Sequence, residues 1–221
     1  MRIVWFFLIF SYGKITSMPS FIKPDSYLLR RRVVLVPPDE IKTEKIQQAL
    51  NQLYEAAESE RMDAKKGFLV GISAPQIGLD LRIILVDLDI GSDNLRPGRL
   101  QAYINPEIIW SSSEIEEERE DCYSVDPRLF GLVSRSLRIK VTALDREGNR
   151  IMEEFSGYTA RIFQHEIDHL NGICFPDRVE DEQNLHWVEE QKYLQYVENW
   201  KEWPIKCPRS LWLSIKTGSG A

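Results

Sequence analysis

Cysteine, a basic surplus and long apolar runs are scarce in this chain of 221 residues, and each absence excludes a class of protein. Three cysteines at irregular spacing give no disulfide framework of the secreted kind, so we expect a reducing compartment. The formal net charge of −6 argues against DNA or RNA binding as the main activity. The strongly apolar run at residues 1–10 is too short to span a bilayer, so we expect no stable membrane association.

That apolar run, MRIVWFFLIF, has two interpretations. It resembles the core of a secretory signal, but no clean small-x-small cleavage site follows it. We favour the second interpretation, an over-long start with translation beginning at Met18, because the rest of the chain has the features of an intracellular protein. Residues 1–20 are therefore treated as an extension, and we expect the protein to be cytoplasmic.

Composition and hydrophobic patterning indicate one α+β domain. With 43% hydrophobic and 28% charged residues, the chain can bury one substantial core. Apolar residues recur at helical spacing over about residues 41–62, which predicts an amphipathic N-terminal helix. Short strand-like runs follow at residues 69–73, 81–88, 102–110, 137–145 and 150–155. We interpret the acidic run at 114–120 as a solvated strand face.

Further helices complete the predicted fold. Residues 157–159 end the strand region and begin a central helix, for which Asn171 and Gly172 supply a stop signal. A C-terminal helix is predicted at about residues 181–201. The remaining tail contains two prolines and a Gly/Ser end, so we expect it to be irregular. The prediction is thus a single domain of short mixed or antiparallel strands around the central helix.

The central helix carries the pattern HExxH, with His165, Glu166 and His169. Residues four apart return to the same helix face, so both imidazoles can reach one cation. Glu166 is then close enough to handle a proton on a metal-bound water. The alternative is that the two histidines are solvated helix residues that fall in register by chance.

A catalytic site of the zinc type needs three protein ligands and one open position, so a third ligand must come from elsewhere. A histidine six residues after His169 would give the metzincin pattern, but Phe175 stands there. Glu189 or Glu190 could complete a thermolysin-like site. Cys122 is the remaining candidate, as a thiolate.

Three short motifs in order resemble the peptide deformylase family. They read LVGISAPQ at residues 69–76, EDCYS at 120–124 and QHEIDHL at 164–170. The similarity covers roughly residues 25–180, which implies a catalytic domain at 21–180 and a C-terminal helix and tail at 181–221. The family implies an enzyme that removes the N-terminal formyl group from chains beginning with formyl-methionine.

The resemblance also assigns the ligands and catalytic groups. It places the metal on Cys122, His165 and His169, with iron(II) expected natively and zinc, nickel or cobalt able to occupy the site in purified protein. Glu166 would take the proton of the attacking water and pass it to the leaving amine. The side-chain amide of Gln76 and the backbone N–H of Tyr123 would stabilise the oxyanion; alone, Gln76 would be read as a turn residue.

Substrate contacts follow from the same comparison. Val70 and Gly71 would lie on an exposed strand edge that pairs with an extended peptide. Ile72, Ile162 and Tyr123 are candidates for the pocket that takes the methionine side chain, with ordinary core packing as the alternative.

The chain departs from the family pattern near this pocket. The usual glycine before the cysteine is Asp121, which places a carboxylate beside the peptide route and could disfavour acidic residues early in the substrate. Arg161 and Glu118 stand at positions that are usually apolar. We predict that these two pair across the pocket wall and give it a polar side; otherwise both point to solvent.

The resemblance implies formylated nascent peptides as partners, met near the ribosomal exit, and gives no oligomeric state. Two other functions remain open at this point. One is an HExxH endopeptidase with Glu189 or Glu190 as third ligand. The other is a non-catalytic protein stabilised by a metal, although such a site would be closed by a fourth ligand and would need neither Glu166 nor Gln76.

Overall fold

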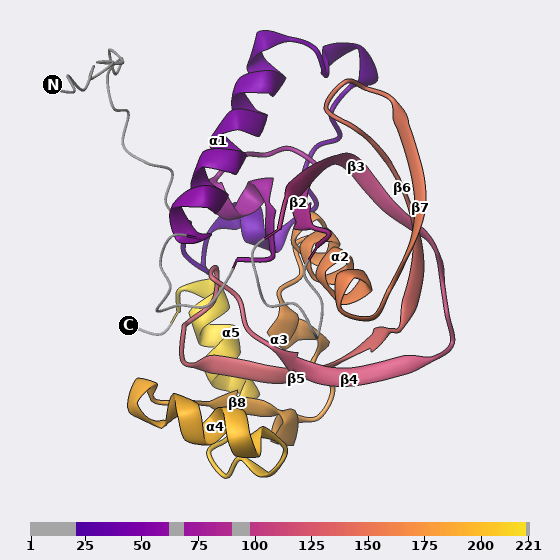
Figure 1. Cartoon of the computed structure of the whole chain (residues 1–221). Helices are drawn as coiled ribbons and strands as arrows, with labels where there is room; N and C mark the ends of the chain where they lie inside the picture. Colours follow the sequence, from indigo (N-terminus) through magenta and orange to yellow (C-terminus); the bar gives the residue numbers. More distant parts are fainter. Residues whose placement is uncertain (1–20, 62–68, 90–97, 220–221) are drawn as a thin grey trace, which may run out of the picture.

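A computed structural model describes residues 21–61, 69–89 and 98–219 of the chain. The extension at residues 1–20, with the expected start at Met18, lies outside the described residues. Figure 1 shows two sheets around a central helix, α2 (Gly157–Leu170), as the HExxH pattern predicts. The α+β class is confirmed.

The larger sheet has five strands in the order β1-β2-β3-β6-β7, and all neighbouring pairs are antiparallel. Its strands are β1 (Gly71–Ser73), β2 (Ile83–Asp87), β3 (Leu100–Ser111), β6 (Arg138–Leu144) and β7 (Arg150–Ser156). Each matches a predicted run. A tight turn with Gly148 at φ +83° joins β6 to β7, and β1 lies at one edge of the sheet.

Strand β2 is buried along its whole length because helices cover both faces of the sheet at this point. Ile83 and Leu85 pack in one core cluster with α1 (Glu44–Arg61), while Ile84 and Val86 pack in another with α2. Side chains of a strand alternate between faces, so a continuous apolar run supplies both clusters. Burying each of these side chains stabilises the fold by roughly 1.5–3 kcal/mol. The position of α2 is thus fixed from the sheet side.

A smaller sheet covers α2 from the other side. It contains β4 (Ile115–Glu120), β5 (Leu129–Ser136) and β8 (Leu185–Trp187), in that antiparallel order. The acidic run forms β4, largely exposed as expected. No strand was predicted at β5, although it is buried over most of its length.

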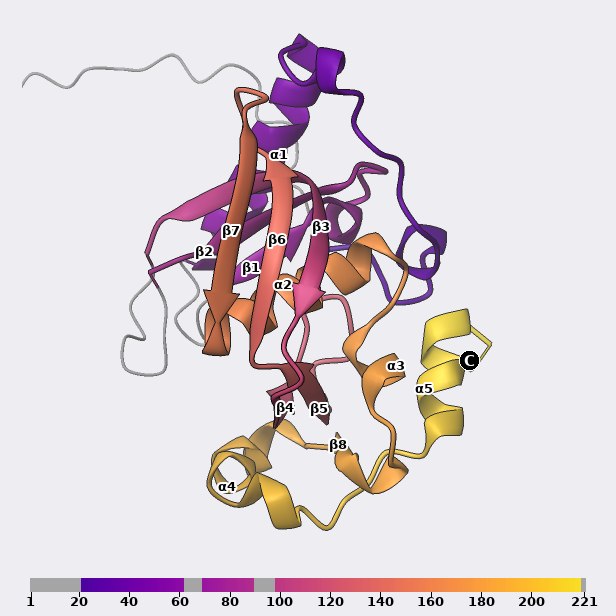
Figure 2. The same cartoon turned by 90° about the vertical axis from the view of Figure 1, so that its right-hand side faces the viewer.

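The C-terminal region differs from the prediction of one helix at 181–201. Strand β8 interrupts that range because Leu185 is fully buried against β5, and only α4 (Tyr193–Asn199) within it is α-helical. The tail was expected to be irregular, but it forms α5 (Arg209–Thr217). Trp212 of α5 is fully buried and donates to Asp177 of α3 (Phe175–Arg178) at 2.8 Å, which docks the helix. Figure 2 shows α5 beside α3.

Short 3-10 helices connect these elements: η1 (Tyr27–Arg30), η2 (Pro38–Glu40), η3 (Ala74–Ile77), η4 (Glu182–Asn184), η5 (Glu190–Lys192) and η6 (Trp200–Glu202). Within the described ranges, every helix is too short or too polar to cross a membrane.

Candidate metal centre

Three donor atoms from two parts of the chain meet beside α2. His165 and His169 lie one turn apart on the helix, and the loop after β4 brings Cys122 to them. The Sγ of Cys122 lies 3.2 Å from Nε2 of His169, which lies 3.2 Å from Nε2 of His165. All three donor atoms lie within 4.8 Å of one another.

This donor set fits a divalent transition metal. One thiolate and two imidazoles are ligands that iron(II) and zinc both accept, and three protein ligands leave a fourth position for water. The ring of His165 is oriented through its other nitrogen, because Nδ1 contacts the carboxylate of Glu120 at 3.0 Å. A hydrogen bond of this kind fixes the ring and leaves Nε2 available for a metal.

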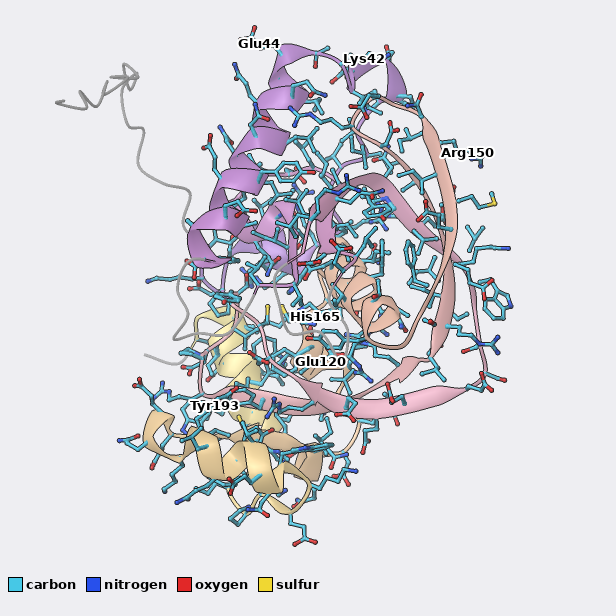
Figure 3. All side chains as sticks on the ribbon, in the orientation of Figure 1. Lys42, Glu44, Glu120, Arg150, His165 and Tyr193 are labelled. Atoms are coloured by element: carbon cyan, nitrogen blue, oxygen red, sulfur yellow. The ribbon has the colours of Figure 1, made fainter. Side chains whose placement is uncertain are left out.

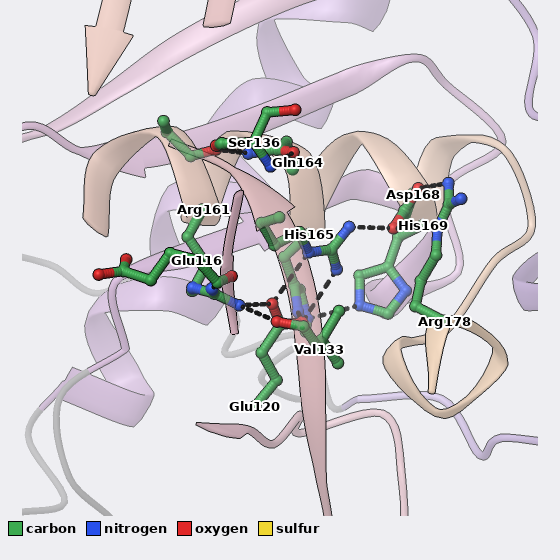
Figure 4. Close-up of polar contacts among 12 residues, drawn as sticks. Glu116, Glu120, Val133, Ser136, Arg161, Gln164, His165, Asp168, His169 and Arg178 are labelled. Carbon is green, nitrogen blue, oxygen red and sulfur yellow. Dashed lines mark hydrogen bonds and ion pairs between the residues drawn. The ribbon is translucent and has the colours of Figure 1, made fainter. Parts of the chain in front are cut away.

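Glu120 accepts hydrogen bonds from three side chains, an arrangement we call the Glu120 network (Figure 4). Nε and Nη2 of Arg135 each lie 2.9 Å from a carboxylate oxygen, and Nη1 of Arg161 lies 2.8 Å from Oε1. Figure 3 shows Glu120 directed toward His165 in the interior. Burial alone would raise the pKa of Glu120, but hydrogen bonds from Arg135 and His165 outweigh it and hold the pKa well below its ordinary value.

The same network continues along α2 through Asp168. Nη1 of Arg135 lies 2.5 Å from Oδ2 of Asp168, and Nη2 of Arg178 lies 2.5 Å from Oδ1. Arg135 therefore bridges two buried carboxylates, one on β4 and one on α2. The sequence analysis gave no role to Asp168, although it stands between the two histidines.

Glu166 is buried next to the donor atoms, with 4% of its surface exposed. Burial raises the pKa of Glu166 to about 7, and this outweighs the opposing effects of His165 and the hydroxyl of Ser73. A carboxyl with such a pKa can both accept and release a proton near neutral pH.

Gly71 is required for the position of that carboxylate. A Cβ at Gly71 would lie 2.7 Å from Cγ2 of Ile162 and 2.8 Å from Oε1 of Glu166. Both distances are shorter than a normal contact, so β1 can approach α2 this closely only with glycine at this position.

Gln76 points its amide nitrogen toward the cysteine. Its Oε1 accepts hydrogen bonds from the backbone N–H and the hydroxyl of Ser73, at 2.7 and 2.9 Å. Nε2 consequently faces Sγ of Cys122 at 3.6 Å. Ser73 thus fixes the orientation of Gln76, a role that the sequence alone did not suggest.

A cavity of about 120 Å³ opens onto these groups. The predicted site residues that line it are Val70, Gly71, Gln76, Asp121, Cys122, Tyr123, Arg161, Ile162, His165 and Glu166. Leu69, Arg119 and Tyr158 also line it and were not predicted. Arg119 and Tyr158 could have been found only from the pairing of β4 with β5 and the start of α2, because neither belongs to one of the three motifs.

Two predicted pocket residues lie elsewhere. Ile72 is fully buried in the core cluster that contains α1, because alternation along β1 turns it away from α2. Glu118 is exposed on β4 and outside the cavity wall.

The predicted pair between Arg161 and Glu118 is therefore wrong. Arg161 is buried and binds Glu120, the backbone oxygen of Val133 at 2.9 Å and that of Glu116 at 2.7 Å. These contacts direct the guanidinium to Glu120 and to the backbone of β4 and β5, and none of them is with Glu118.

The endopeptidase alternative also lacks support. Glu189 and Glu190 are exposed at η5, and Glu189 pairs with Lys192 at 2.9 Å. In the described part of the chain, the cluster of metal-type ligands around the two histidines is completed by Cys122 and by neither glutamate.

The fold and this site together define a metal-dependent hydrolase. The model of the family described as polypeptide deformylase matches residues 21–185. The chain belongs to this family, whose members hydrolyse N-formyl groups with a bound metal, and it carries a matching Cys/His/His site.

Individual relatives agree with this assignment. A peptide deformylase of Brachyspira hyodysenteriae is 42% identical over 126 residues, or 57% of this chain and 67% of the relative. A peptide deformylase of Prochlorococcus marinus (strain NATL1A) is 40% identical over 124 residues, which is 56% of this chain and 58% of the relative. The matched stretch thus spans about three fifths to two thirds of these curated relatives.

Solved structures match over their whole length. The class I type b peptide deformylase of Acinetobacter baumannii bound to Met-Ala-Ser has a TM-score of 0.64 at 29% identity, covering 74% of this chain and 100% of the other. The peptide deformylase of Thermotoga maritima has a TM-score of 0.62 at 32% identity, covering 75% and 100%.

Proposed function

We propose that this chain removes the formyl group from formyl-methionine at the start of newly synthesised polypeptides and releases formate. The observation that carries the proposal is the convergence of Cys122, His165 and His169 around one point with the carboxylate of Glu166 buried beside them. We propose residues 21–180 as the catalytic domain and residues 181–221 as a C-terminal region that packs against it.

Iron(II) is the native metal in this proposal, and zinc, nickel or cobalt can replace it during purification. Held by Cys122, His165 and His169, a metal ion would lower the pKa of its water toward about 7 and would polarise the formyl carbonyl. The protein supplies orientation: Glu120 fixes the ring of His165, and the N–H of Ser124 donates to Sγ of Cys122 at 3.4 Å, which holds the sulfur in position.

Glu166 acts as the general base and then as the general acid. It accepts the proton of the attacking water and passes it to the amine of the methionine as the carbon–nitrogen bond breaks. Its buried position excludes bulk water, and its raised pKa of about 7 suits both directions of transfer.

Gln76 and Tyr123 stabilise the oxyanion of the tetrahedral intermediate. The amide of Gln76 is oriented by Ser73 so that its N–H groups face the site. The backbone N–H of Tyr123, next to the ligand cysteine, is the second donor. Each such donor typically contributes about 3–4 kcal/mol of transition-state stabilisation.

The peptide lies along the edge of β1. Because β1 is an edge strand, the backbone of Gly71 faces a position where an extended chain can add hydrogen bonds; Val70 precedes it, and the oxygen of Val70 accepts from the N–H of Asp87 at 2.8 Å. Ile162 supplies apolar surface for the methionine side chain, and Asp121 disfavours acidic residues early in the substrate. The Acinetobacter neighbour was solved with Met-Ala-Ser bound, which supports a peptide of this kind as ligand.

The chain would meet its substrates in the cytoplasm as they leave the ribosome. This follows from the substrate, since a formyl group on a nascent chain is available as soon as the N-terminus emerges.

The test is anaerobic purification with metal analysis, followed by formate release from a short formyl-Met peptide. We expect one metal per chain and turnover that is lost in Glu166→Gln while the metal is retained. Cleavage of internal peptide bonds without formate release would support an endopeptidase instead. Bound metal with neither activity would leave only a structural role for the site.

A further inference from the structure

A second and larger cavity lies beside α2, apart from the metal donors. Its volume is about 740 Å³, within the usual range of small-molecule sites. Its walls come mainly from β3, β5, α2 and the segments that flank β2 and α2. The residues of α2 that line it, such as Gln164 and Ile167, are not those that line the cavity at the metal centre.

The wall of this cavity is rich in positive charge, although the whole chain has a net charge of −6. Four arginines and two carboxylates line it, an excess of two positive charges: Arg32, Arg82, Arg135, Arg178, Glu107 and Asp168. All three guanidinium nitrogens of Arg135 already bind carboxylates, those of Glu120 and Asp168. The other three arginines therefore decide what the cavity can bind.

Arg82 is a buried guanidinium without an ion-pair partner in the described part of the chain. Only 4% of it is exposed, and its hydrogen bonds go to neutral acceptors. Nε donates to the oxygen of Pro106 at 3.2 Å, and Nη1 donates to Oδ1 of Asn171 at 2.9 Å and to the oxygen of Leu170 at 3.4 Å. No described residue accepts a hydrogen bond from Nη2 of Arg82, and Arg82 lines the cavity. A buried charge that meets only dipoles is costly unless an anion joins it.

Two further guanidiniums add to this charge. The side chain of Arg32 is exposed and makes no hydrogen bond or ion pair with any described residue. Nε and Nη2 of Arg178 bind the carboxylate of Asp168, so Nη1 remains available to an anion. Burial and the charge of Arg32 lower the pKa of Arg82, whereas Glu107 opposes this from a distance. The repulsion between Arg32 and Arg82 is the interaction that an anion would relieve.

We propose that this cavity binds a doubly charged oxyanion of the phosphate class, held by Arg32, Arg82 and Arg178. Planar guanidinium groups match the oxygens of a tetrahedral anion, and the anion would balance the excess of two charges. The oxyanion is either free phosphate or the phosphate group of a small metabolite, for whose body the cavity has room.

The experiment uses the zinc-loaded full chain, titrated with inorganic phosphate and, separately, with AMP. Binding is followed by calorimetry, and its place is followed by amide NMR shifts of Ser134, Ser136 and Asn171 on the cavity wall. Arg32→Gln removes an exposed arginine with no internal partner, so folding should be unaffected. Arg150→Gln, on the exposed end of β7 (Figure 3), is the matched control for loss of one positive charge.

We expect saturable binding, weakened about tenfold or more by Arg32→Gln because one charged hydrogen-bonding group is lost, and unchanged by Arg150→Gln. Tighter binding of AMP than of phosphate identifies a metabolite, and equal binding identifies the free anion. The proposal is overturned if neither probe saturates below about 10 mM. It is also overturned if both variants weaken binding equally, or if the shifts are confined to residues around the metal.

Discussion

The Glu120 network allows a quantitative prediction, with Glu120→Gln as the perturbation. The carboxylate accepts four hydrogen bonds, two from Arg135 and one each from Arg161 and His165. An amide keeps one acceptor oxygen and presents an NH₂ group to the other donors. At least one charged hydrogen bond on the NH₂ side is therefore lost, and the remaining ones become weaker.

The expected loss of stability is about 3–5 kcal/mol, the usual result of removing one partner of a buried ion pair. Arg161 keeps its two backbone acceptors and Arg135 keeps Asp168, so the loss should not exceed this range. It is still a large part of a total stability of about 5–15 kcal/mol. Because the ring of His165 is also released, we expect metal affinity to fall by about 10–100-fold.

Urea unfolding of the metal-free protein at pH 7 isolates the network, and competition with a chromogenic chelator then measures zinc affinity. Glu118→Gln is the matched control, because it makes the same change at an exposed position of the same strand. The pKa of Glu120 lies below its ordinary value in the folded state, so its contribution is complete above pH 4.5 and is lost as the pH falls further. The difference in the free energy of unfolding between Glu120→Gln and the wild type should therefore shrink as the pH falls below 4.5.

The reasoning is refuted if Glu120→Gln and Glu118→Gln lower the stability equally, by less than about 1 kcal/mol, with zinc affinity unchanged. That outcome would mean that the buried arginines find other partners at little cost.

Four further predictions follow from the site and its surroundings. Cys122→Ala should lose the metal, as measured by metal analysis after gel filtration; full retention would point to another third ligand. Gly71→Ala should keep the metal but lower formate release by about 10²-fold, because the added Cβ displaces Glu166; wild-type turnover would show that the carboxylate can move freely. Gln76→Ala should lower kcat by about 10²–10³-fold, and a change confined to KM would contradict its role at the oxyanion. Burial and, to a smaller extent, the charge of Lys206 lower the pKa of His186 to about 4, so the stability that depends on neutral His186 is present above pH 6.5 and is lost as the pH falls toward 4. Urea unfolding across this range should show a smaller pH dependence in His186→Gln, and an identical pH dependence would refute the assignment.

The parts of the site that depend on local spacing could be predicted from the sequence. His165 and His169 are one helical turn apart, so their common face follows from helix geometry alone. The grouping with Cys122 required the family resemblance, because residues 43 or more positions apart are brought together by the sheets rather than by any local pattern.

The errors arise where tertiary contacts decide between local alternatives. Side chains two positions apart on a strand lie on the same face, so Glu118 and Glu120 share one face of β4. Arg161 was predicted to bind Glu118 but binds Glu120, two residues further along that face. Strand β8 was predicted as part of a helix because its residues are mixed in polarity, whereas its pairing with β5 decides its conformation. The docking of α5 through Trp212 could not be inferred from a segment that ends in glycine and serine.

The position of Glu120 has a practical consequence for preparing this protein. The carboxylate joins segments separated by 15, 41 and 45 residues in the chain. A fragment that ends before His165 or begins after Glu120 lacks part of this set, so tight metal uptake should report completion of the native topology. The metal content of a refolded sample would then measure the fraction of correctly assembled molecules, independently of any activity assay.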